Sequence, residues 1–269
     1  MTSRVLLLAP VCALLVFACG ASAERTALPD GSVGFTLGQD TIKPAAPPGE
    51  PAAAFPAPVR PVADIVAARW TDEDSRDDAG EFRRVAELAR IRPGLQVADI
   101  GAGDGYYVAR LSPLVGATGR VYGQDIMPEY LRILQQRVRR DQLANVQVVF
   151  GEAHDPRLPA ATIDLAIMIH MYHEIEHPFA LLWNLVTALK PGGRLLILDL
   201  DRPTYGHGTP PQLLRCELKA VGYREVTFRR TASEEYVAIF EAPALAQRPT
   251  PAAISEALRA SPCRAPGNG

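Results

Sequence analysis

The sequence predicts a doubly wound α/β domain, in which helices cover both faces of a mostly parallel sheet. Two observations predict this class. Apolar segments of strand length alternate with segments of helical periodicity from Phe82 to Ala242. The first apolar segment ends in a carboxylate and a glycine-rich turn that opens a helix, which is the pattern of a nucleotide-type pocket. With 269 residues and 48% hydrophobic content, the chain can bury one full core.

The start of the chain is typical of a secretory signal peptide. Residues 1–23 contain one basic residue, Arg4, then an apolar run and small residues that end in Ala23. The segment around Cys19 resembles a bacterial lipoprotein cleavage box, so cleavage after Ala23 and lipidation of Cys19 both stay open. Either route predicts export, to the periplasm or to a lipid-anchored place on the bacterial envelope; an uncleaved membrane anchor is the less favoured alternative.

Two segments rich in Pro and Ala flank the expected domain, which spans residues 63–242. Residues 24–62 lack hydrophobic periodicity, which predicts a disordered linker. Residues 243–269 are expected to form a disordered tail with one short helical candidate, residues 253–260. Cys216 and Cys263 could pair in an oxidising compartment. The net charge of −2 favours a small-molecule substrate and gives no reason to expect a nucleic-acid partner.

The first helix of the domain is expected over residues 80–90, where apolar residues recur at helical spacing. Pro93-Gly94 ends it and leads into a strand over residues 96–100. The acidic segment 72–74, with Trp70 before it, could cover the pocket as a lid or be the solvated start of a helix.

Beyond the glycine-rich turn, helices and strands continue to alternate. Pro128 suits a first helical turn, and Lys190-Pro191-Gly192-Gly193 is a helix end followed by a left-handed turn. We expect helices at 106–114, 128–140, 178–189 and 212–221, and strands at 120–125, 146–150, 163–169, 194–198, 225–228 and 236–241.

The glycine-rich turn runs from Asp99 to Tyr106. Its three alternating glycines allow positive φ and close approach of the backbone to a ligand, and the next helix offers free N–H groups. The dinucleotide fingerprint requires a glycine where Tyr106 stands, and a pyrophosphate fits poorly against Asp99 and Asp104. A ligand that carries ammonium and sulfonium cations fits these carboxylates, and a Rossmann oxidoreductase is disfavoured.

The pattern Asp99-x-Gly101-x-Gly103-x-Gly105 resembles motif I of class I S-adenosylmethionine-dependent methyltransferases, and the Leu-Lys-Pro-Gly-Gly segment is similar to another local pattern of that family. The resemblance covers about residues 82–242 and is closest to the group that includes quinone-biosynthesis methyltransferases (type 11). It implies a Rossmann-like, seven-stranded sheet with an antiparallel C-terminal strand, and S-adenosylmethionine as cofactor.

The resemblance also implies the roles of several strand-end residues. Asp125 matches the residue that binds the cofactor's ribose, and Glu152-Ala153 stands where the family has an adenine-binding Gly-Asp-Ala, with Glu in place of Asp. The full set expected to contact the cofactor is Asp99, Gly101, Gly103, Gly105, Tyr106, Asp125, Ile126, Glu152, Ala153 and His170.

The loop after the fourth parallel strand is expected to carry the chemistry. Methyl transfer from a sulfonium is an in-line displacement, in which a base is needed only if the acceptor must lose a proton. His173 is the candidate base, with Glu174 orienting it and Tyr172 or Tyr106 lining the substrate side; His170 and Tyr107 are fallbacks. A structural role for His173, capping the next helix, is the equal alternative.

The same loop contains His173-Glu174-Ile175-Glu176-His177, which satisfies the His-Glu-x-x-His pattern of zinc peptidases. That motif needs a continuous helix through both histidines and a third ligand, whereas Pro178 follows at once. The sequence therefore predicts a methyltransferase without a metal site. A non-catalytic module that binds a nucleoside or lipid is the main alternative, because S-adenosylmethionine is made in the cytoplasm.

Overall fold

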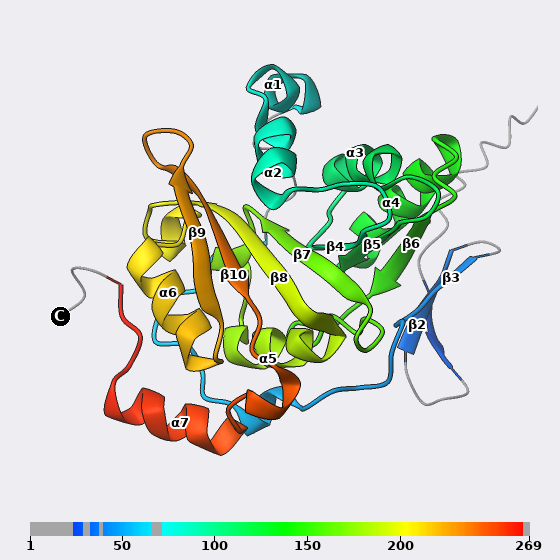
Figure 1. Cartoon of the computed structure of the whole chain (residues 1–269). Coiled ribbons are helices and arrows are strands. Elements are labelled where there is room, and N and C mark those ends of the chain that lie inside the picture. Colours follow the sequence, from blue (N-terminus) through cyan, green and yellow to red (C-terminus); the bar gives the residue numbers. More distant parts are fainter. Residues whose placement is uncertain (1–23, 29–32, 38–39, 66–71, 266–269) are drawn as a thin grey trace, which may run out of the picture.

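The computed structural model describes residues 24–28, 33–37, 40–65 and 72–265. They form a seven-stranded sheet with helices on both faces and a separate small sheet (Figure 1). The predicted leader, Cys19 and Trp70 lie outside the described residues. No helix in the described part of the chain is long and apolar enough to cross a membrane.

The large sheet confirms the predicted fold class. Its order is β6-β5-β4-β7-β8-β10-β9, parallel from β6 to β8, with β10 antiparallel to both of its neighbours. The strands are β4 (Gln96–Ile100), β5 (Arg120–Asp125), β6 (Val146–Phe150), β7 (Ile163–Ile169), β8 (Leu189–Leu200), β9 (Arg224–Arg230) and β10 (Glu235–Glu241).

Helices cover both faces of this sheet because its central strands are apolar on both sides. Along β8, for example, Leu196 and Leu198 belong to one core cluster, whereas Ile197 belongs to the other. Helices α2, α3 and α4 pack on the first face and α5, α6 and α7 on the second. The helices are α1 (Glu73–Asp78), α2 (Glu81–Ala89), α3 (Tyr106–Val115), α4 (Pro128–Arg140), α5 (Pro178–Ala188), α6 (Pro211–Ala220) and α7 (Pro251–Ala260).

Strand β8 begins earlier than predicted. The segment expected to be a turn, residues 190–193, is an irregular first part of the strand, which pairs with β7 from Leu189 onward and shifts register between Ile163 and Leu165. Gly192 has a φ of +76°, which lets the backbone absorb this irregularity.

The prediction of a disordered linker over residues 24–62 is wrong for the described part of that segment. Strands β1 (Glu24–Ala27), β2 (Val33–Leu37) and β3 (Asp40–Ile42) form a small antiparallel sheet beside β6 (Figure 1). Phe35 is buried and packs edge-to-face on Phe150, with ring centroids 4.5 Å apart. The segment has no hydrophobic periodicity because it does not form a core of its own. Single side chains, which we call anchors, pack instead into the surface of the domain.

Arg60 is the most consequential of these anchors. Its guanidinium is buried, pairs with Glu217 of α6 at 2.9 Å, and donates to the carbonyl oxygens of Tyr172, His173 and Ile175 at 3.3–3.4 Å. The N-terminal segment thereby fixes the loop that follows β7.

The prediction of a disordered tail is also wrong for residues 243–265. Helix α7, expected over 253–260, begins at Pro251 with Thr250 as its cap, and it buries Ile254. Cys263 forms a disulfide with Cys216 of α6, as the sequence allowed. The tail is therefore tied to the second face of the sheet.

Replacing Arg60 with alanine should destabilise the protein strongly, because it leaves Glu217 buried without its counter-charge. We expect a loss of about 3–5 kcal/mol in the free energy of unfolding, measured by urea denaturation. Arg202→Ala, which breaks the exposed pair with Glu234, is the matched control and should cost less than about 1 kcal/mol. Equal effects of the two substitutions would contradict the anchoring role.

Candidate active site

A cavity of about 490 Å³ opens at the carboxyl edge of the parallel strands. It lies where the strand order reverses, since β5 and β6 extend from β4 on one side and β7 and β8 on the other. Ligands of open α/β sheets bind at this switch point. Its walls are the turn after β4 and the segments that follow β5, β6, β7 and β8.

The three motif glycines all have positive φ, but they do different work. A Cβ on Gly103 would meet nothing within 4 Å, so this backbone faces the open cavity. On Gly105 it would lie 2.5 Å from Leu134 Cδ1, and Gly105 is absent from the cavity wall. Gly105 therefore allows close packing of α3 against α4, while Gly101 and Gly103 border the cavity.

Asp125 connects the glycine turn to the loop after β5. Its carboxylate is buried and accepts hydrogen bonds from the backbone N–H groups of Gly103 (2.9 Å), Ile126 (2.7 Å) and Met127 (2.9 Å). Burial raises the pKa of Asp125 despite these bonds. Asp125 and Ile126 line the cavity, where the resemblance expects the ribose.

Asp99 is a second buried carboxyl group on the cavity wall. Burial, reinforced by the charges of Asp125 and Asp104 and opposed by Arg76, raises the pKa of Asp99 to about 8. A cationic ligand would favour the ionised carboxylate. The ammonium and sulfonium groups of S-adenosylmethionine are such cations, so the carboxyl groups of the cavity fit the implied cofactor.

The remaining predicted cofactor residues also reach the cavity wall: Tyr106, Glu152, Ala153 and His170. Glu152 is partly engaged by Arg157, whose Nη1 donates to it at 2.8 Å. Tyr106 donates its hydroxyl hydrogen to Asp77 of α1 at 2.8 Å, and the Arg76 guanidinium lies 3.8 Å from the centre of its ring. Ser75 and Arg76 of α1 line the cavity. The acidic residues 72–74 are the cap and first turn of this helix and do not line the cavity, which agrees with the helix-start alternative.

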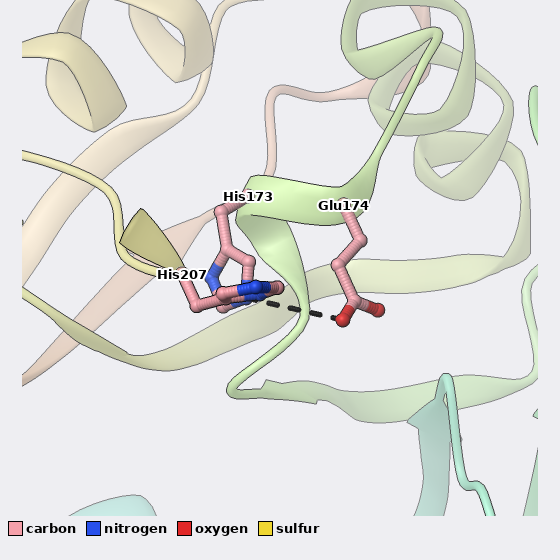
Figure 2. Close-up of side chains that lie close together, drawn as sticks. All are labelled: His173, Glu174 and His207. Carbon is pink, nitrogen blue, oxygen red and sulfur yellow. Dashed lines mark ion pairs between the residues drawn. The ribbon is translucent and has the colours of Figure 1, made fainter. Parts of the chain in front are cut away.

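His173 lies on the cavity wall and is almost fully buried. Its Nδ1 is 3.0 Å from Asp199 Oδ1, a fully buried carboxylate near the end of β8. The pairing directs Nε2 toward Glu174, which is 4.0 Å away, and the His207 ring lies edge-on at 5.5 Å between centroids (Figure 2). His173 is thus oriented by Asp199, not by Glu174 as the sequence suggested.

Tyr172 does not line the substrate side. Its ring is fully buried on the α5–α6 face and its hydroxyl donates to Glu217 at 2.8 Å. In a short 3₁₀ turn, consecutive side chains point in different directions, so Tyr172 and His173 cannot both enter the cavity.

The peptidase pattern at 173–177 lacks the helix it requires. The 3₁₀ turn η2 (Tyr172–Glu174) ends before Ile175, and His177 occupies the N-cap position of α5 without a side-chain hydrogen bond to the helix. Sequence reasoning missed Asp199 and His207. Asp199 follows a buried strand and could have been found by that position; His207, in the β8–α6 connection, carries no such signal.

Comparisons with known proteins agree with this geometry. A family model described as a methyltransferase domain matches residues 97–193. The ubiquinone/menaquinone biosynthesis C-methyltransferase UbiE of Pseudomonas putida is 34% identical over 123 residues, which are 45% of this chain and 48% of the relative. The chain therefore spans about half the length of the curated relatives it matches.

Among solved structures, a SAM-dependent methyltransferase from Aquifex aeolicus has a TM-score of 0.59 at 24% identity, over 64% of this chain and 100% of that chain. The [4+2]-cyclase SpnF has a TM-score of 0.54 at 16% identity, over 71% and 90%. Residues 97–193 thus match a methyltransferase domain, and the fold is that of class I S-adenosylmethionine-dependent methyltransferases, a similarity that implies S-adenosylmethionine as the cofactor.

Alanine substitutions at two motif glycines should separate binding from folding. Both positions have positive φ, which costs an alanine about 1–2 kcal/mol. Gly103→Ala should lose about this much stability but place a methyl group in the cavity and weaken binding of S-adenosylhomocysteine.

Gly105→Ala is the matched comparison. It should lose about 2–5 kcal/mol in the free energy of unfolding, because its Cβ also meets Leu134. Calorimetric titration measures binding and urea unfolding measures stability. The assignment would be contradicted if one of the two variants had the larger effect in both assays.

The ionisation of Asp99 predicts a pH dependence. Because the pKa of Asp99 is raised to about 8, the folded protein keeps its proton up to that pH, whereas the unfolded chain releases it near the ordinary pKa of an aspartate. The free energy of unfolding therefore falls as pH rises from that ordinary pKa to about 8. Asp99→Asn should therefore stabilise the unliganded protein, more at about pH 9 than at about pH 6.

Binding should show the opposite dependence. The affinity for S-adenosylmethionine should rise with pH as Asp99 ionises, with proton release visible as a buffer-dependent heat of binding. In Asp99→Asn both effects should vanish; a pH dependence that survives this substitution would refute the role of Asp99.

Proposed function

We propose that this chain transfers a methyl group from S-adenosylmethionine to a small-molecule acceptor. One observation carries the proposal: a single cavity joins the glycine turn and Asp125 to the His173–Asp199 pair. The first end suits the adenosyl cofactor, and the second offers an oriented imidazole nitrogen to an acceptor. Such a layout would place donor and acceptor in one cavity.

The chemistry requires little from the protein beyond alignment. A lone pair of the acceptor attacks the methyl carbon in line with the breaking S–C bond, whose electrons return to sulfur and yield S-adenosylhomocysteine. An acceptor that carries a proton must lose it, and His173 is the group placed to activate it. With Asp199 accepting a hydrogen bond from Nδ1–H, the imidazole is held in the tautomer whose Nε2 is unprotonated and can accept a proton.

The fold by itself does not establish this reaction, since a protein described as a [4+2]-cyclase shares it. The relative UbiE is described as a C-methyltransferase of ubiquinone and menaquinone biosynthesis, and that name supports a small organic acceptor. A module that binds without turnover is the alternative that the experiment must separate.

Export is part of the proposal. The leader pattern of residues 1–23 supports it, and the Cys216–Cys263 disulfide suits an oxidising compartment. Fractionation of the host and the intact mass of the mature chain would test export and lipidation of Cys19. A full-length chain confined to the cytoplasm would refute it.

His173→Ala should separate the two ends of the cavity. We expect binding of S-adenosylhomocysteine to change little, because the residue lies at the acceptor end, whereas methyl transfer to metabolites of an envelope extract should fall by about 10²–10⁴-fold. Mass spectrometry of products gaining one methyl and calorimetry provide the two readouts.

Asp125→Ala is the companion variant and should lose binding. Binding without any turnover in the wild type would favour the non-catalytic module, and absence of binding would remove the methyltransferase proposal.

A further inference from the structure

We propose that His173, Glu174 and His207 bind a divalent transition metal ion of the zinc class, which holds the acceptor. One potential ligand atom from each side chain lies within 4.8 Å of the other two. Figure 2 shows the three side chains converging from the η2 turn and from the connection between β8 and α6. The inference deepens the proposed function and rests on it only for the identity of the acceptor end.

The donor set matches zinc chemistry. Two imidazoles and one carboxylate are the protein ligands of many catalytic zinc sites, in which the fourth position is left for water or substrate. All three residues line the same cavity as the glycine turn. An ion held by them would therefore face the space in which the acceptor must lie.

A supporting group behind the ligands strengthens the assignment. Metal-binding histidines characteristically donate their second ring N–H to a carboxylate, which fixes the ring and makes it a better ligand. His173 has this partner in Asp199, at 3.0 Å from Nδ1, and Leu200 N donates to the same Oδ1 at 2.8 Å.

The connection that carries His207 is held in place by backbone contacts. His207 has a φ of +55° at the end of the η3 turn (Thr204–Gly206). Just after it, Thr209 N donates to Leu200 O at 2.7 Å, and Tyr236 donates its hydroxyl hydrogen to Thr209 O at 2.7 Å. These contacts place the third ligand on a fixed backbone, as a metal site requires.

A second cluster in the described residues, Glu81, His170 and Glu235, has similar spacing but a different electrostatic setting. Arg76 Nη2 lies 2.6 Å from Glu81, and Arg84 Nη2 lies 3.4 Å from Glu235. Guanidinium groups already supply the positive charge there. The first cluster, in which the Asp199 carboxylate supports His173, is the one we assign to a metal ion.

The acceptor class follows from the ion. Zinc coordinates hydroxyl and thiol groups and lowers their pKa, so an acceptor with such a group would lose its proton to solvent at neutral pH. His173 then acts as a ligand instead of as a proton acceptor. We expect acceptors with an oxygen or sulfur donor at or beside the methylated atom.

The test is zinc binding by the purified full chain, freed of metal with a chelator and titrated in competition with a chromophoric chelator. The wild type should bind one equivalent of Zn²⁺, and Co²⁺ in its place should give the visible absorption bands of a tetrahedral site. His207→Ala should abolish this binding, and Asp199→Asn should weaken it about 10–100-fold. His177→Ala, the matched control from the peptidase pattern, should bind as the wild type does.

The outcomes separate this inference from the proposed function. No stoichiometric zinc in the wild type, unchanged binding in His207→Ala, or loss in His177→Ala would overturn the metal site. Binding of S-adenosylhomocysteine, measured on the same metal-free samples, tests the cofactor end independently. Thermal unfolding of each variant identifies any loss of binding that is merely loss of fold.

Discussion

The structure depends on how three buried aspartates at the carboxyl ends of parallel strands are compensated. Asp99, Asp125 and Asp199 are each no more than 5% exposed. Removing a carboxylate from water is costly unless hydrogen bonds, a counter-charge or a proton offset the loss. The three residues use different compensation, and that difference divides the cavity into functional regions.

Asp125 is compensated by the backbone. Three N–H groups donate to it, so its carboxylate holds the glycine turn and the loop after β5 in a fixed relation. Asp199 is compensated by an imidazole, which it orients in return. Among the described residues Asp99 has no comparable set of donors, and burial raises its pKa to about 8, so a proton or a cationic ligand would compensate it. Asp125 and Asp199 are thus held by hydrogen bonds, whereas the charge of Asp99 depends on pH.

The segments before and after the domain act on the site from a distance. Arg60 donates hydrogen bonds to three backbone carbonyl groups of the loop that carries His173 and Glu174. It also neutralises Glu217, to which the buried Tyr172 donates. A disulfide fixes the C-terminal tail to the same helix, α6. Substitutions in these segments would therefore change the position of the loop that carries His173.

The sequence by itself determined the parallel strands and the cofactor end. The strands β4 to β7 were predicted with their observed limits, and Asp99, Gly103 and Asp125 lie on the cavity wall, because apolar patterning and turn chemistry are local properties of the chain. Only the tertiary structure decided the partner of His173, the packing role of Gly105 and the anchoring by Arg60. Each of these depends on which segments meet in space, and residues 26 to 157 positions apart share no sequence signal for that meeting.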